Sequence, residues 1–70
     1  MEFITVTEAM KIIRVTRPIL IQYINDYQLG IKVGGQYRIK PDMLNKFVQV
    51  REKSQKENLS LRETWNKENV

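Results

Sequence analysis

The sequence predicts a small α+β domain with two short helices, a β-hairpin and a third helix, followed by a polar tail. Three observations support this fold class. Apolar residues recur twice at helical spacing before residue 28, the period changes to two around a Gly-Gly pair, and a proline opens another apolar stripe at residue 41. With 70 residues, 41% of them apolar, the chain can form one thin core. We expect one domain over residues 1–50 and a charged tail over residues 51–70, either flexible or a helix that needs a partner.

Two short helices are expected first. Thr5 and Glu8 have the spacing of a capping box, in which the threonine hydroxyl accepts from the N–H of the glutamate and the carboxylate accepts in return. Thr16 precedes a second start, because Pro18 is tolerated in a first helical turn, where N–H groups lack internal partners. The apolar stripes are Val6, Ala9, Met10 and Ile13, then Leu20, Tyr23, Ile24 and Tyr27. Such a short connection between two helices is typical of a helix-turn-helix.

Residues 31–39 predict a β-hairpin, because apolar and polar residues alternate on both sides of two glycines. We expect a three-residue loop, since a two-residue loop would mix apolar and polar residues on each face. The expected loop consists of Gly34, Gly35 and Gln36. The expected pairs are Val33 with Tyr37, Lys32 with Arg38, and Ile31 with Ile39.

A third helix is expected from Pro41 and Asp42, because proline suits a first turn and an acidic side chain suits the positive end of a helix. Its core-facing residues are Leu44, Phe47 and Val48. Beyond residue 50 the chain is mostly charged and polar. The apolar residues of this tail, Leu59, Leu61 and Trp65, are expected to contact a neighbouring copy of the protein.

The composition argues against catalysis. The chain contains no histidine and no cysteine, which removes the usual general base, the usual nucleophile and the soft metal ligands. We therefore expect no enzymatic activity, metal, cofactor or small-molecule ligand. No stretch resembles a signal peptide or a membrane span, so we expect a protein of the bacterial cytoplasm, associated with the nucleoid.

The outer face of the second helix carries amide and cationic side chains. Arg17, Gln22 and Asn25 lie opposite its apolar stripe, and these residue types can pair with guanine or adenine in the major groove of DNA. Arg17 at the positive helix end is best explained by a nearby phosphate or guanine, although a solvated arginine is the alternative. Ile21 is either an ordinary surface residue or a contact to a thymine methyl group.

The hairpin is also cationic, and the chain has a net charge of +4. The expected register sets Lys32 opposite Arg38, with Lys40 two residues further on, and like charges in that arrangement destabilise a bare sheet. Binding to phosphates would reverse that penalty, and a slim glycine tip could approach a minor groove. The alternative is that these cations protect an exposed edge strand. The candidate DNA contacts are Thr16, Arg17, Pro18, Ile21, Gln22, Asn25, Lys32, Gly34, Gly35, Gln36, Arg38 and Lys40.

Residues 4–48 resemble the excisionase-type, MerR-like winged helix-turn-helix domain. Members of that family typically contain Thr-Val-x-Glu-Ala-Ala, Val-Ser-Arg and Arg-Val-Gly-Gly-x-Tyr-Arg-Ile. The matching strings are Thr5-Val6-Thr7-Glu8-Ala9-Met10, Val15-Thr16-Arg17 and Lys32-Val33-Gly34-Gly35-Gln36-Tyr37-Arg38-Ile39. This sequence departs from the family at Arg14, where glycine is usual, and at Gly30, where Leu-Pro is common.

The resemblance implies binding to double-stranded DNA, with Arg17, Gln22, Lys32 and Arg38 as the carried-over contacts. It further implies an excisionase, that is, a recombination directionality factor of a phage or mobile element that acts with an integrase and self-associates on DNA. The alternative within the family is a small transcriptional repressor or activator. A third hypothesis is a protein-binding adaptor that docks through Pro18, Ile21 and the tail.

Overall fold

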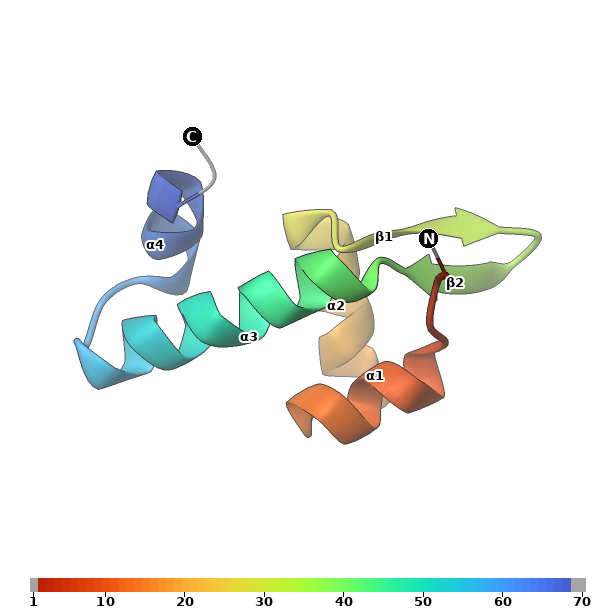
Figure 1. Ribbon diagram of the computed structural model, residues 1–70, viewed down its shortest axis with the longest axis horizontal. Helices are drawn as coiled ribbons and strands as arrows, with labels where there is room; N and C mark the ends of the chain where they lie inside the picture. Colours follow the sequence, from red (N-terminus) through yellow and green to blue (C-terminus); the bar gives the residue numbers. More distant parts are fainter. Residues whose placement is uncertain (1, 69–70) are drawn as a thin grey trace.

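The computed structural model describes residues 2–68, which form a small α+β domain (Figure 1). The order of elements is α1 (Val6–Ile13), α2 (Arg17–Tyr27), β1 (Gly30–Val33), β2 (Gln36–Ile39), α3 (Pro41–Lys56) and α4 (Leu61–Glu68). The expected pair of helices, hairpin and third helix are therefore confirmed as elements. Within the described residues, no helix combines the length and apolar character needed to cross a membrane.

Helix α1 begins at the capping box that the sequence predicts. The N–H of Glu8 donates to Thr5 Oγ1 at 3.2 Å, and the N–H of Thr5 donates to Glu8 Oε1 at 3.2 Å. Two of the orphan N–H groups at this end are thereby satisfied. The helix ends at Arg14, whose backbone has φ 57° and ψ 51° in the left-handed region.

Helix α2 follows after the short connection of residues 14–16. Thr16 is the N-cap residue with extended backbone, but its side chain makes no capping hydrogen bond. Leu20 and Ile24 are buried, whereas Tyr23 and Tyr27 are half-buried at the edge of the same face. In Figure 1, α2 lies behind α3, and the rings of Tyr23 and Tyr27 each lie 4.9 Å from that of Phe47 on α3, so this face of α2 packs toward α3.

The hairpin differs from the expected register. β1 and β2 pair antiparallel with Val33 opposite Gln36, Lys32 opposite Tyr37 and Ile31 opposite Arg38, so the loop contains two residues and the three-residue prediction was wrong. Gly34 and Gly35 have φ 55° and 82°, as a type I′ turn requires at both central positions. The twist of that turn matches the twist of the strands, and this preference outweighed the expected segregation of apolar side chains. Ile31 and Val33 are consequently exposed.

A segment near the N-terminus covers the second edge of β2. Ile4 forms an isolated antiparallel bridge with Ile39, in which the N–H of Ile4 donates to Ile39 O at 2.9 Å and the N–H of Ile39 donates to Ile4 O at 3.0 Å. Ile39 is buried completely. The bridge attaches the start of α1 to the hairpin and fixes the distance between them.

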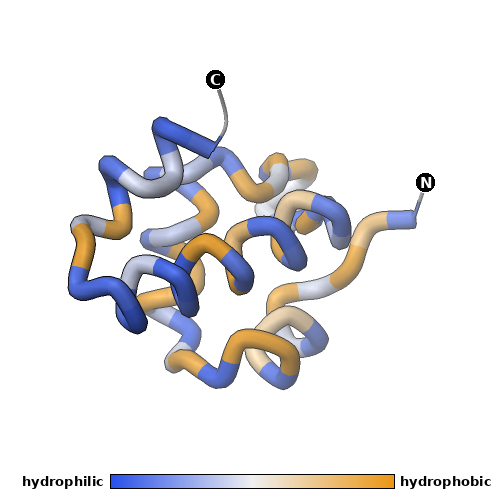
Figure 2. Tube along the Cα trace, turned by 60° about the vertical axis from the view of Figure 1, so that its left-hand side comes forward, coloured by the Kyte–Doolittle hydropathy of each residue, from blue (hydrophilic) through white to orange (hydrophobic). Residues whose placement is uncertain are grey.

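Helix α3 continues past the expected domain boundary at residue 50, and the tail is not separate. Trp65 of α4 is 6% exposed and packs against Tyr27 and Phe47, with ring centroids 5.9 and 5.5 Å apart. Figure 2 shows apolar and hydrophilic residues alternating along the helices, as expected when each contributes one face to a shared core. On α3 the buried face consists of Leu44, Phe47, Val50 and Ser54, with Val48 half-buried beside it.

Candidate nucleic-acid interface

The outer face of α2 presents most of the side chains expected there. Gln22 and Asn25 are exposed, while Ile21 is half-buried because it lies beside the buried stripe of α2. Sequence reasoning overlooked Asp26, which is exposed one turn after Gln22 and gives this face one carboxylate. The candidate residues at the start of the helix, Thr16, Arg17 and Pro18, are exposed as well.

A groove of about 270 Å³ lies between the N-terminal ends of α1 and α2 and the hairpin. It brings together Arg17 of α2 and Arg38 of β2. Its lining residues are Thr5, Val6, Thr7, Arg17, Gly35, Gln36, Tyr37 and Arg38. Thr5 and Thr7 were not among the candidate contacts. The sequence indicated only that a helix starts at these residues, and it gave no sign that they line a groove.

Two features would favour an anion in the groove, beside the carboxylate of Glu8 that is engaged by Thr5 in its wall. Arg17 and Arg38 form no ion pair with any residue of the described chain, so both guanidinium charges are uncompensated there. The adjoining start of α2 has no acidic residue in its first turn and no side-chain cap. The unpaired N–H groups and the helix dipole add partial positive charge at that end. An anion placed in the groove would interact favourably with both arginines and with the start of α2.

The charges of the hairpin lie on both of its faces. Residues directly opposite in an antiparallel pair share a face, so Arg38 is on the face of Ile31, and Lys32 is on the face of Tyr37. The expected opposition of Lys32 and Arg38 is therefore wrong, as a consequence of the two-residue turn. Lys32 Nζ instead lies 5.5 Å from the ring centroid of Tyr37.

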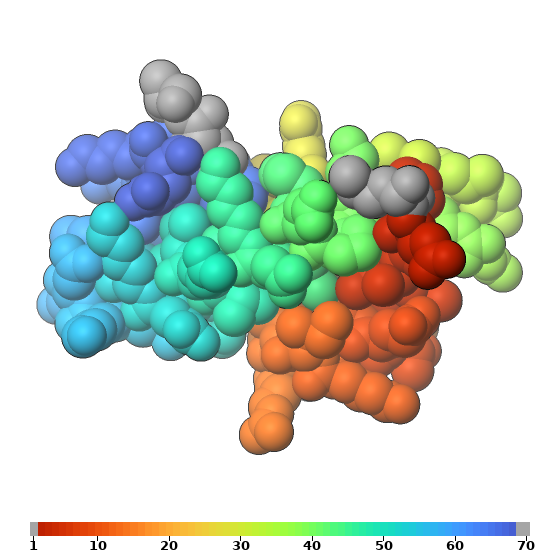
Figure 3. Space-filling view, viewed as in Figure 1, coloured from red at the N-terminus to blue at the C-terminus, as the bar shows by residue number. Residues whose placement is uncertain are grey.

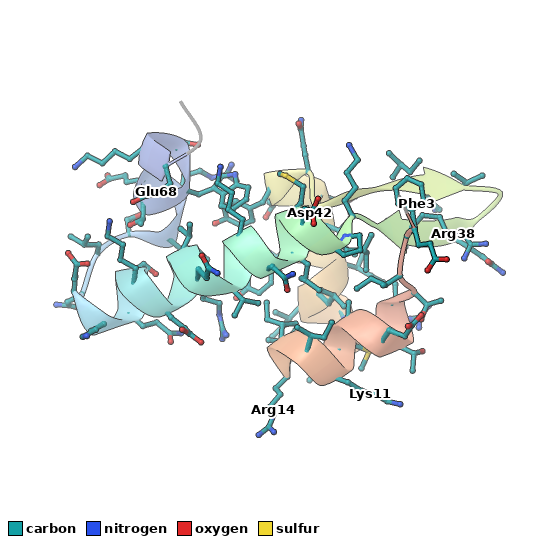
Figure 4. All side chains as sticks on the ribbon, in the orientation of Figure 1. Phe3, Lys11, Arg14, Arg38, Asp42 and Glu68 are labelled. Carbon is teal, nitrogen blue, oxygen red and sulfur yellow. The ribbon has the colours of Figure 1, made fainter. Side chains whose placement is uncertain are left out.

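The tip and base of the hairpin are accessible. Lys32 and Lys40 are exposed and Arg38 is half-buried; at the turn, Gly34, Gly35 and Gln36 are exposed. Figure 4 shows Arg38 at the hairpin end of the molecule and Glu68 at the other end. The cations of the hairpin are thus well separated from the ion pair between α3 and α4.

The residues expected to join neighbouring copies do not form one surface. Leu59 is 51% exposed, but Leu61 is half-buried and Trp65 belongs to the core. The expected contact surface is incorrect for Trp65, because its indole is covered by Tyr27 and Phe47 within the same chain. Figure 3 shows α4 against one end of α3, with the hairpin at the other end.

Comparison of the chain with protein-family models, with curated proteins and with solved structures found no match. The structural feature that bears on function is the arrangement of α2, the hairpin and the groove beside them.

Proposed function

We propose that this chain binds double-stranded DNA as a winged helix-turn-helix, with α2 as the recognition helix and the β1–β2 hairpin as the wing. The observation that carries the proposal is the meeting of Arg17 and Arg38, two arginines without carboxylate partners, in one groove beside the uncapped start of α2. A phosphate is the anion that suits such a site in a protein of net charge +4.

Helix α2 would read the bases. Gln22 and Asn25 are exposed on its outer face, and their amides can form paired hydrogen bonds with adenine in the major groove. Asp26 on the same side can accept from the amino group of cytosine, and it repels phosphates that approach in a wrong orientation. Arg17 would bind phosphate or guanine at the start of the helix.

The wing would follow the sugar-phosphate backbone. Because Lys32 and Arg38 lie on opposite faces, the ribbon can meet a phosphate strand on each side, as a ribbon inserted edgewise into a groove of DNA would. The turn of Gly34 and Gly35 carries no side chains beyond hydrogen, so the tip is narrow enough for a minor groove. Lys40 would extend the positive charge toward the base of the wing.

Within this activity we propose the role of an excisionase, which binds beside an attachment site and acts with an integrase. The resemblance of residues 4–48 to the excisionase-type family supports this role. A small transcriptional regulator would use the same helix and wing. A footprint across an attachment site and across the promoter of its own gene, with integrase-dependent excision measured in parallel, separates the two roles.

Affinity for DNA as a function of salt tests the proposal directly. Each phosphate that a variant no longer neutralises should lower the slope of log affinity against log salt by about 0.9. Arg17→Gln and Arg38→Ala should therefore weaken binding to every duplex and reduce the slope, whereas Gln22→Ala should relax preference at one base pair by about 1–3 kcal/mol.

Lys56→Ala is the matched control, because it removes one exposed positive charge at the far end of α3. A salt-insensitive interaction would favour the adaptor hypothesis and contradict DNA binding. Equal losses in the Arg38 and Lys56 variants would contradict the assignment of the groove.

A further inference from the structure

We infer that Arg62 of α4 is a positioning residue that fixes the last turn of α2, so that the C-terminal helix takes part in reading DNA without contacting it. The mechanical part of this inference is independent of the proposed function. Its consequence for DNA rests on that function, and a separate experiment addresses each part.

Arg62 makes two contacts with consecutive residues at the end of α2. Its Nη1 donates to the backbone oxygen of Asp26 at 3.1 Å, across 36 positions of sequence. Its guanidinium carbon lies 4.5 Å from the ring centroid of Tyr27, within the range of a cation–π interaction. One side chain therefore holds both the backbone and a side chain of the same helical turn.

The end of α2 is closed by backbone hydrogen bonds alone, without a cation of its own and without glycine at the cap. It has no basic residue in its last turn, and its C-cap residue is Gln28 with φ 56°, where glycine would be unstrained. The N–H groups of Gln28 and Leu29 both donate to the same carbonyl, that of Ile24. Arg62 adds the cation that this negative helix end lacks, and it donates to a further terminal carbonyl, that of Asp26.

Helix α4 is itself held in place, so Arg62 has a fixed base. Trp65, one turn after Arg62, is buried against Tyr27 and Phe47. Near the other end of α4, Lys53 Nζ of α3 donates to Glu68 Oε1 at 2.7 Å. Attachment at both of these points keeps Arg62 directed at α2.

The last turn of α2 bears on base reading because of its neighbours. Asn25 precedes Asp26 directly, and Gln22 lies one turn earlier on the same helix. Hydrogen bonds to base edges require accurate placement of the amides. Fraying of the last turn of α2 would displace the amide of Asn25 before that of Gln22. Loss of Arg62 should thus weaken specific binding through the geometry of α2, with the phosphate contacts unchanged.

Amide hydrogen exchange by NMR tests the mechanical part in the absence of DNA. In Arg62→Ala, exchange at Gln28 and Leu29 should become about five- to tenfold faster, the effect of losing one solvent-exposed hydrogen bond, while exchange at Ile4 and Ile39 stays unchanged. Arg62→Lys should lie between, because lysine keeps the positive charge but not the planar fork of N–H groups. Lys67→Ala removes an exposed charge from the same helix and should leave all four amides unaffected.

DNA titrations at several salt concentrations test the consequence. Arg62→Ala should lower affinity for a specific site about three- to tenfold with an unchanged salt slope. Unchanged exchange at Gln28 and Leu29, or equal acceleration in the Lys67 variant, would overturn the inference. A reduction of the salt slope by about 0.9 in Arg62→Ala would also overturn the inference, since Arg62 would then bind a phosphate itself. If the wild-type chain fails to bind DNA, the proposed function fails, while the exchange experiment still decides whether Arg62 fixes α2.

Discussion

Arg14 and Gln28 end α1 and α2 in the left-handed region of the backbone, with φ of 57° and 56°. A side chain other than glycine or asparagine in that region costs about 1–2 kcal/mol, because its Cβ approaches the following carbonyl. Both residues nevertheless let the chain turn at once, which keeps the connection between the helices short. Asn58, after α3, has the same φ of 56° at a lower cost, since asparagine tolerates this conformation.

Substitution of Arg14 by glycine should stabilise the fold. Relief of strain at φ 57° exceeds the added entropy of glycine in the unfolded chain, so the free energy of unfolding should rise by about 0.5–1 kcal/mol. Urea denaturation of Arg14→Gly measures this. Asn58→Gly is the matched comparison, and its gain should be smaller. A larger gain at position 58 than at position 14 would contradict the strain assigned to Arg14.

The pairing of β1 with β2 depends on the absence of a side chain at Gly30. A Cβ at this position would collide with the backbone oxygen of Arg38 and lie 2.8 Å from Ile39 Cα. Because these are backbone atoms of the paired strand, they cannot move aside as a flexible side chain would. The close approach explains why this sequence tolerates glycine in a strand, where it is ordinarily unfavourable.

Gly30→Ala should therefore destabilise the hairpin, with a loss of about 2–3 kcal/mol in the free energy of unfolding. Gly34→Ala is the control, since a Cβ there meets no atom within 4 Å and only the strain at φ 55° remains. Its cost should be about 1 kcal/mol. Thermal or chemical denaturation compares the two, and a milder effect at position 30 than at position 34 would refute the steric explanation.

The starts of the first three helices could be predicted from the sequence, because each depends on residues close together in the chain. The capping pair of Thr5 and Glu8 started α1, and Pro18 and Pro41 marked the first turns of α2 and α3, because caps and prolines act within a few residues. The hairpin loop was predicted incorrectly, since the alternation of apolar residues was weighted above the turn that Gly34 and Gly35 favour.

The candidate site divides in the same way between local and tertiary causes. Exposure of Gln22 and Asn25 follows from helical periodicity, so it could be predicted. The meeting of Arg17 with Arg38 in one groove could not, because it depends on how the hairpin packs beside α1 and α2. Burial of Trp65 was likewise unpredictable, since a lone tryptophan in a polar segment gives no sign of its contact partners.

The C-terminal helix is joined to α3 by an ion pair between Lys53 and Glu68. The hydrogen bond from Lys53 lowers the pKa of Glu68, and the same bond to Glu68 raises the pKa of Lys53. The lowered pKa of the Glu68 carboxyl stabilises the fold at pH values above the ordinary pKa of a glutamate. This contribution is lost as the pH falls through the lower pKa of the folded state. For Lys53, the contribution is present at pH values below the ordinary pKa of a lysine. It is lost as the pH rises through the raised pKa of the folded state.

Lys53→Met should accordingly reduce stability by a small, constant amount between about pH 5 and pH 10, and the difference from wild type should shrink below about pH 4. The amount is small because both side chains are exposed to solvent, at 49% and 40%. Denaturation at several pH values measures it. Lys56→Met, which removes a lysine outside the ion pair, should show no pH-dependent difference, and the same acid response in both variants would contradict the assignment.

The burial of Trp65 also has a practical consequence. Because the sequence contains a single tryptophan, its fluorescence comes from one defined position, enclosed by Tyr27 and Phe47. Detachment of the last helix would transfer the indole to water and shift its emission to longer wavelength. The protein thus carries an intrinsic optical probe that distinguishes an attached C-terminal helix from a released one, with no dye or label required.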